Sequence, residues 1–177
     1  VATARHPAML DYLDNAYSTR DWPQPDGSVV KGLNQNYGRE LLELHTVGVD
    51  GGYSQADVVA VSRALTGWTI DWEFTSDGAH FAAWAHDPDP KTVMGGLSLP
   101  ANGGEQDGFA VLHFLATHPM TAERVSRLLV ERFVNEEAPP TVVMAATRKY
   151  LETMGDLRAV LRVILLSPEF LSLQHAR

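Results

Sequence analysis

The chain has 177 residues and a formal net charge of −8, with 45% hydrophobic and 20% charged residues. These values fit a globular domain with its own core and exclude wholesale disorder, and no apolar run approaches the roughly 20 residues of a transmembrane helix. The negative charge argues against a nucleic-acid partner. The absence of Cys excludes disulfides, thiolate zinc sites and cysteine nucleophiles.

The first elements predicted along the chain are two helices separated by a loop. His6-Pro7 opens a helix that runs to about Tyr17, because Pro is well tolerated at the first helical position. Residues 18–33 are predicted as a loop, since they contain two prolines and two glycines without any period. A second helix is predicted over about Asn34–Val47, and Gly48 is a suitable residue to end it.

A third helix and a hairpin follow. Ser54–Asp57 resembles a capping box and opens a helix that continues to about Leu65. The spacing of apolar residues then changes from 3.6 to 2, which predicts a β-hairpin over 69–84. A short strand is expected at 92–94, and the Gly-rich residues 95–104 are expected to form a loop.

The remaining chain is predicted to be helical throughout. Helices are expected over about 105–117, from His118-Pro119, over about 139–155, and after the capping residue Asp156. In the two His-Pro pairs, at residues 6 and 118, the imidazole is expected to cap its helix.

The predicted fold class is therefore mainly α, with about six or seven helices and one β-hairpin near 69–84. We expect one domain over residues 1–177. It has an acidic helix and hairpin part at 1–104 and a plainer helical tail at 105–177.

The second helix carries apolar residues nearly all round. On a regular helix, Tyr37, Leu41 and Leu44 mark the face that contacts the core, whereas Leu42 falls on the polar flank. An apolar residue on that flank predicts an exposed apolar patch there, or a contact with another chain.

The same helix carries candidate functional residues. Glu40 and His45 flank its core face, and Glu43 lies farther round. Carboxylates beside a core face must be paired, protonated or bound to a metal. They are either ligands or acid/base groups, or structural ion pairs of Glu43 with Arg39 and of Glu40 with a base such as Arg63.

His86-Asp87 follows the hairpin, where an imidazole and a carboxylate suit a metal site or a general base with its orienting group. The alternative is a polar loop with an Asx turn. We predict that His45 and His86-Asp87 share one partly buried pocket, which Glu40 or Glu43 completes. Such ligands suit a divalent metal: Zn²⁺, Fe²⁺ or Mn²⁺.

Three tryptophans form the other candidate site. Trp68, Trp72 and Trp84 could provide a stacking platform for a ligand, or they could join the hairpin to the helices as core residues.

Several segments together resemble one bacterial family, the proteins grouped as domain of unknown function 1800 (DUF1800). The most specific strings are Glu40–Thr46 (ELLELHT) and Arg63–Thr69 (RALTGWT). The other segments are 6–15, 36–39, 51–58, 86–87 and 167–170. Gln35 and Gly38 depart from the family pattern, where Glu and Ala are usual. Gly38 costs the helix up to roughly 1 kcal/mol unless a close contact requires it.

The resemblance implies that the chain corresponds to the C-terminal part of a longer exported protein, located in the periplasm, cell envelope or medium. The family has no established reaction. Two functions therefore remain open. The first is a binding or structural module that packs against its own N-terminal region or another protein chain. The alternative is a metal-dependent enzyme, a hydrolase or an oxidoreductase, with the Glu/His/His/Asp site described above.

Overall fold

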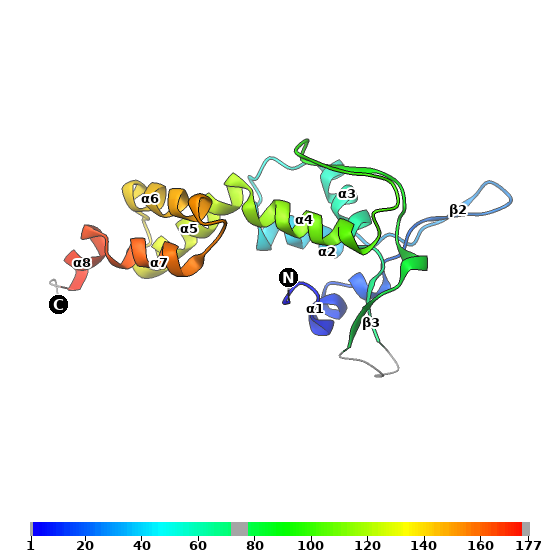
Figure 1. The fold of residues 1–177 in the computed structure, drawn as a ribbon, viewed down its shortest axis with the longest axis horizontal. Coiled ribbons are helices and arrows are strands. Elements are labelled where there is room, and N and C mark those ends of the chain that lie inside the picture. The colour runs from blue at the N-terminus through cyan, green and yellow to red at the C-terminus, as the bar shows by residue number, and fades with distance from the viewer. Residues whose placement is uncertain (1, 72–77, 175–177) are drawn as a thin grey trace. The chain divides into compact units, whose positions relative to one another are not determined.

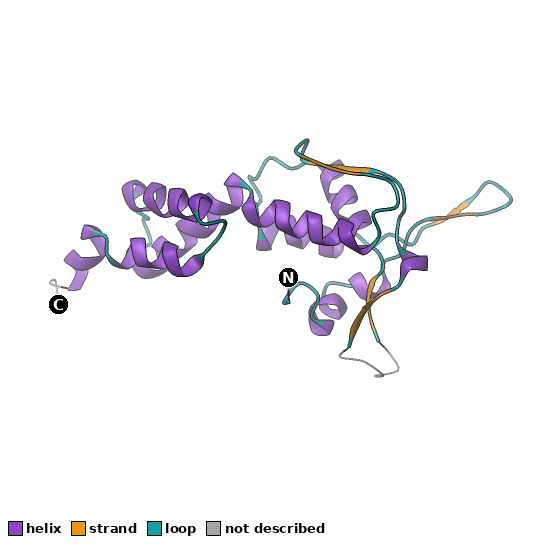
Figure 2. Cartoon of the chain, viewed as in Figure 1, coloured by secondary structure: helices purple, strands orange, loops and turns teal. Residues whose placement is uncertain are grey.

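The computed structural model describes residues 2–71 and 78–174, and helices dominate it (Figures 1 and 2). Eight α-helices and three short antiparallel ladders lie in the described residues, which confirms the mainly α class. The chain contains two compact units: Val1–His45 with Gly52–Phe114, and Thr46–Gly51 with Leu115–Arg177. No helix within the described ranges has both the length and the apolar character needed to cross a membrane.

The first unit contains four helical segments and all three ladders. Its helices are α1 (Pro7–Tyr12), α2 (Asn36–Glu40), α3 (Gln55–Leu65) and most of α4 (Glu105–Thr117). Its shorter turns are η1 (Asn15–Tyr17), η2 (Leu41–His45) and η3 (Ala83–Ala85). Its strands pair as β1 (Trp22–Pro23) with β2 (Val29–Val30), β3 (Trp68–Ile70) with β4 (Ala79–Phe81), and β5 (Lys91–Val93) with β6 (Leu97–Leu99).

The predicted hairpin is present at its base. Trp68 pairs with Phe81 and Ile70 pairs with Ala79 across β3 and β4. The tip at 72–77, which includes Trp72, lies outside the described residues. The short strand predicted at 92–94 is present as β5. The other strands, β1, β2 and β6, lie within the predicted loops 18–33 and 95–104, where two or three residues a strand are too few to produce a recognisable alternation.

The second predicted helix is not a regular α-helix. After α2 the chain continues as the π-helical turn η2 and ends before Gly48, whose φ is +87°. A π-turn bonds residue i to i+5 rather than i+4, so every later side chain moves round the axis. Leu42 is fully buried, and Leu44 is 55% exposed. The predicted exposed apolar patch at Leu42 is therefore wrong, as is the predicted core position of Leu44.

Gly38 makes a close contact, which explains why glycine is present despite its cost to the helix. α2 packs on α3 at this residue. A Cβ at Gly38 would lie 3.0 Å from Ser62 N and 3.1 Å from Val58 O, and closer still to Ser62 Oγ. Backbone atoms cannot move aside cheaply, so only glycine allows the two helices to approach this far.

The predicted helix caps are confirmed. In the capping box of α3, the Ser54 hydroxyl accepts from Asp57 N, and the Asp57 carboxylate accepts from Ser54 N at 2.7 Å. His6 Nδ1 accepts a hydrogen bond from Ala8 N, and His118 Nδ1 accepts one from Met120 N. Each imidazole thereby satisfies a backbone N–H that the helix leaves free. Burial lowers the pKa of His118, which favours the neutral ring that capping requires.

The second unit is a helical bundle of α5 (Pro119–Phe133), α6 (Pro140–Glu152), α7 (Leu157–Leu165) and α8 (Pro168–Gln174). The first three lie side by side in Figure 1. Their shared core is formed by Ala122, Val130, Val134, Val142, Val143, Ala146, Tyr150, Val160 and Ile164. The Tyr150 hydroxyl donates to Ala116 O at 2.8 Å.

Candidate functional site

His86 lies deep in the first unit, directly after η3. Its side chain is 4% exposed, and its Nδ1 lies 2.8 Å from Thr66 O. Because a carbonyl oxygen only accepts, Nδ1 must carry the proton. Nε2 lies 3.3 Å from Asp107 Oδ2 without hydrogen-bonding geometry.

Lys91 supplies the charge that balances Asp107. Its side chain is fully buried, and its ammonium donates to Asp107 Oδ2 at 2.8 Å. It also donates to Asp87 O at 2.7 Å and Asp89 O at 2.8 Å. An ammonium has three donors, so each has a partner. Lys91 thus fastens the 87–89 turn to the start of α4.

Asp87 faces α3 rather than a cavity. The Arg63 guanidinium donates two hydrogen bonds to the Asp87 carboxylate, from Nε to Oδ2 at 2.7 Å and from Nη2 to Oδ1 at 2.9 Å. Asp87 N also donates to Thr66 Oγ1. Burial acts to raise the pKa of Asp87, but the bonds from Arg63 and from Asp89 N outweigh it and hold that pKa below its ordinary value. The same pair raises the pKa of Arg63.

These residues form one interconnected group, which we call the buried polar cluster: Arg63, Thr66, His86, Asp87, Lys91 and Asp107. Its arginine, lysine and Asp87 groups already have partners inside the protein. The cluster ties together the end of α3, the loop after the hairpin, β5 and α4. Such an arrangement holds a loop in place, because buried charges are tolerated only when they are paired and hydrogen-bonded.

The other predicted metal ligands belong to α2 and η2: Glu40 ends α2, and Glu43 and His45 lie in η2. Glu40 and Glu43 are half-buried and His45 is exposed. Among described residues none of them forms a hydrogen bond or ion pair with His86 or Asp87. Within the described residues no ion pair forms with Glu40 or Glu43: Arg63 binds Asp87, and Arg39 donates to Gln55 Oε1.

No group of three or more His, Asp or Glu side chains within 2–71 and 78–174 is arranged to hold a metal ion. The predicted metal site at Glu40, Glu43, His45, His86 and Asp87 stays a prediction.

Lys91 and Asp107 were missed by the sequence analysis. One signal could have found Lys91. Lys91 and the fully buried Val93 are two residues apart in β5. The period of a strand therefore places both side chains on the same, buried face. Asp107 gave no comparable signal, because an acid in the first turn of a helix is ordinary at the surface.

The tryptophans are divided between the core and the surface. Trp68 is buried, with its ring 5.3 Å from that of Phe109. Trp84 is 66% exposed and stacks on Trp22 at 6.2 Å. The Arg20 guanidinium lies 4.1 Å over the Trp22 ring. Trp68 is therefore a core residue, whereas Trp84 pairs with a tryptophan that the predicted platform did not include.

Replacing Asp87 with Asn is expected to destabilise the first unit by about 2 kcal/mol at pH 7, since it breaks a mostly buried pair with Arg63. The Asp87 pKa is lower in the folded than in the unfolded chain, where it is about 3.9. The stabilisation is therefore complete above pH 4 to 5 and disappears as pH falls through the folded pKa. Urea unfolding of wild type and Asp87→Asn should converge at low pH.

The control is Asp89→Asn in the same loop, whose side chain is 78% exposed and lies 3.9 Å from Arg63 Nη2. It should change the unfolding free energy little at any pH. A difference between wild type and Asp87→Asn that stays constant from pH 7 to pH 2 would contradict the prediction.

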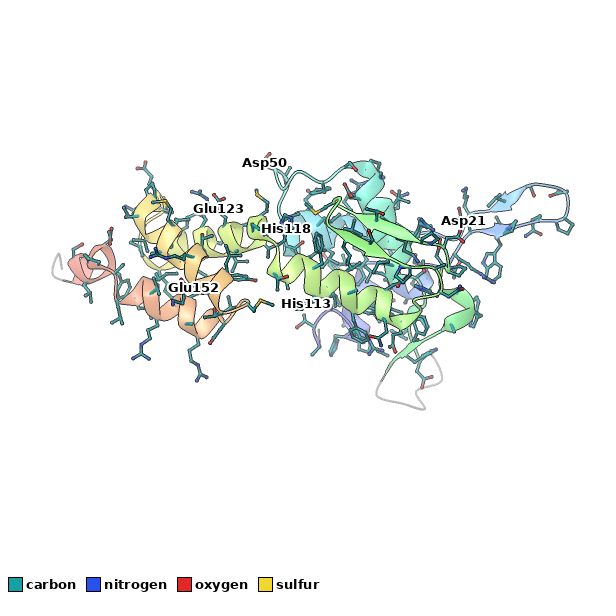
Figure 3. All side chains as sticks on the ribbon, turned by 45° about the horizontal axis from the view of Figure 1, so that its top comes forward. Asp21, Asp50, His113, His118, Glu123 and Glu152 are labelled. Atoms are coloured by element: carbon teal, nitrogen blue, oxygen red, sulfur yellow. The ribbon has the colours of Figure 1, made fainter. Side chains whose placement is uncertain are left out.

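The second unit contains an apolar groove between α5 and α6. Pro140, Val143, Met144, Thr147 and Leu151 line it, with a volume of about 500 Å³. Its charged walls are Glu123 and Arg127 on α5 and Arg148 and Glu152 on α6; Figure 3 labels the two glutamates. The groove thus combines an apolar floor with walls whose charges cancel.

Comparison with known proteins gives one result. A family model described as "Protein of unknown function (DUF1800)" matches residues 1–177. No match was found among curated proteins or among solved structures. The family match covers the strings that carry the resemblance in the sequence, at Glu40–Thr46 and Arg63–Thr69. The chain therefore belongs to the DUF1800 family.

Proposed function

We propose that this chain is a protein-binding module, and that the groove between α5 and α6 takes an amphipathic helix of another protein chain. The observation that carries the proposal is the exposure of Met144, which is 66% accessible on the floor of the groove. Leu151, on the same floor, is 41% exposed. Covering the exposed part of these side chains gains at most about 1.5–3 kcal/mol each, which favours an apolar occupant.

The spacing of the two residues favours a helix as the occupant. Met144 and Leu151 are seven residues apart on α6, two turns or about 10.5 Å along its axis. Apolar residues at i and i+7 of a partner helix repeat at the same interval. The walls carry two acids and two bases. A partner helix with both charges beside its apolar stripe therefore fits better than a polyanion.

The buried polar cluster supports a structural role for the groups that could otherwise act in catalysis. Lys91 uses all three donors inside the protein, and the Asp87 carboxylate is held by Arg63. The metal-dependent enzyme stays an untested alternative. Metal analysis of the purified chain, before and after dialysis against a chelator, tests it directly.

The family resemblance supports a location outside the cytoplasm, and we include this location in the proposal. The partner is expected to be present there, so the test uses the cells that produce the protein. A photo-crosslinking amino acid replaces Met144, and the control position is Glu136, which is exposed between α5 and α6. We expect a discrete adduct with one protein from position 144 and none from position 136. Leu151→Lys, added to the first variant, should remove the adduct because it places a charge on the groove floor.

Two results would overturn the proposal: no adduct from position 144, or the same adducts from both positions. Circular dichroism of each variant checks that the helices are retained. An adduct with an earlier segment of the same polypeptide would show that the occupant of the groove is the chain's own N-terminal region rather than another protein.

A further inference from the structure

The outer face of α7 differs from every other helix surface discussed above. Val160 and Ile164 point into the core of the second unit. The opposite side carries Arg158, Leu161, Arg162, Leu165 and Leu166 around a shallow hollow of about 550 Å³. Leu166 is 64% exposed. This face, which we call the α7 face, is separate from the groove between α5 and α6 (α7 is labelled in Figure 1).

The charge on the α7 face is uncompensated. Leu157–Leu165 contains two arginines and no acid. In the described part of the chain, the guanidiniums of Arg158 and Arg162 form no hydrogen bond or ion pair. The carboxylate of the nearby Asp156 accepts instead from the backbone N–H groups of residues 158 and 159. By contrast, Arg127 on α5 is paired with Glu123.

The arginines and leucines share one face rather than occupying opposite sides. The two arginines are four residues apart, so they lie one above the other. On a regular helix, Leu161 and Leu165 lie to one side of them and Leu166 to the other. Long arginine side chains can reach anionic groups while their methylenes lie along apolar surface. The complementary surface must therefore offer negative charge and apolar chains side by side.

We propose that the α7 face binds the surface of a lipid bilayer that contains anionic lipid. Arg158 and Arg162 contact the headgroup phosphates, and Leu161, Leu165 and Leu166 enter the boundary between headgroups and acyl chains. A basic amphipathic helix that lies in the plane of the membrane has this composition. The bilayer is favoured over an acidic protein helix because the leucines flank the arginines on both sides, and a single partner helix covers only one side.

The test is cosedimentation of the full chain with vesicles of phosphatidylglycerol and phosphatidylcholine, compared with phosphatidylcholine alone, at low and at 0.5 M salt. We expect binding only to the anionic vesicles, and weaker binding at high salt. Neutralising both charges with Arg158→Gln and Arg162→Gln should weaken binding about twenty-five-fold, since each basic residue near an anionic surface contributes about fivefold. Arg132→Gln is the matched control and should bind as wild type does, because Arg132 is an exposed residue of α5 that lines neither the groove nor the α7 face.

Leu166→Ser tests the apolar half of the proposal separately and should reduce binding at both salt concentrations. All four replaced side chains are exposed, so circular dichroism should show folded variants. The proposal fails if wild type does not bind anionic vesicles at low salt, or if Arg158→Gln/Arg162→Gln binds as wild type does. Equal binding to both vesicle types would also overturn it. So would binding of an acidic amphipathic peptide to the α7 face by a chain that does not bind vesicles.

Discussion

Replacing Lys91 with Met is expected to lower the free energy of unfolding of the first unit by about 3–5 kcal/mol, the usual cost of breaking a buried ion pair. The change leaves the Asp107 carboxylate, which is 2% exposed, without its cation. It also leaves two carbonyl oxygens, of Asp87 and Asp89, without their donor. Asp107→Leu should also be destabilising, because it removes the nearer carboxylate from the buried ammonium of Lys91 and leaves it with two carbonyl oxygens and with Asp87 Oδ1 at 3.8 Å.

The double variant Lys91→Met/Asp107→Leu separates a lost pair from lost packing. It contains no uncompensated charge, so it should be more stable than the sum of the two single changes predicts, by about 2 kcal/mol or more. Tryptophan fluorescence during urea unfolding reports on the first unit alone, since all four tryptophans lie within it.

The control for this experiment is Lys31→Met. Lys31 pairs with Asp21 in the same unit, but its side chain is 77% exposed. Solvent screens such a pair, so the change should leave the unfolding curve nearly unaltered. Simple additivity of Lys91→Met and Asp107→Leu would show that the two groups do not act as a pair.

Helix starts could be predicted from the sequence because their causes are local. His6, Ser54, His118 and Asp156 each cap a backbone N–H two or three residues ahead. The same holds for the base of the hairpin, where alternation and a turn signal coincide within one short segment. A pattern confined to a few neighbouring residues needs no knowledge of the rest of the fold.

The π-turn after α2 could not be predicted in this way. The angles of a regular helix placed Leu44 inside and Leu42 outside, and the structure reverses both. The close packing of α2 on α3 is a contact between residues 20 or more apart, such as Gly38 with Val58 and Ser62. Tertiary packing of this kind decides helix geometry over local propensity.

The candidate site shows the same division. The sequence singled out His86 and Asp87 as a metal or acid–base pair or as part of a polar loop, and both belong to the buried polar cluster. The ion pairs of the cluster were not predicted. Arg63 is 24 residues from its partner Asp87, and Lys91 is 16 residues from its partner Asp107. Ion pairs between distant segments produce no periodic pattern in the sequence. From the sequence alone, His86 and Asp87 could therefore be metal ligands or members of a structural cluster.

Replacing Trp68 with Ala is expected to destabilise the first unit by about 3–5 kcal/mol, the range for a fully buried aromatic side chain. The ring packs 5.3 Å from Phe109 and lies beneath the guanidinium of Arg5 at 5.4 Å, and all of these contacts would be lost. Trp68→Phe should cost much less. It keeps an aromatic ring in the core and removes an indole N–H that is buried without a hydrogen bond among the described side chains.

Trp84→Ala is the matched comparison, since it removes the same side chain from an exposed position in the same unit. It should cost less than about 1 kcal/mol, because the ring contacts Trp22 at the surface rather than the core. Urea unfolding followed by the fluorescence of the remaining tryptophans measures both variants. Equal losses for Trp68→Ala and Trp84→Ala would contradict the assignment of Trp68 to the core.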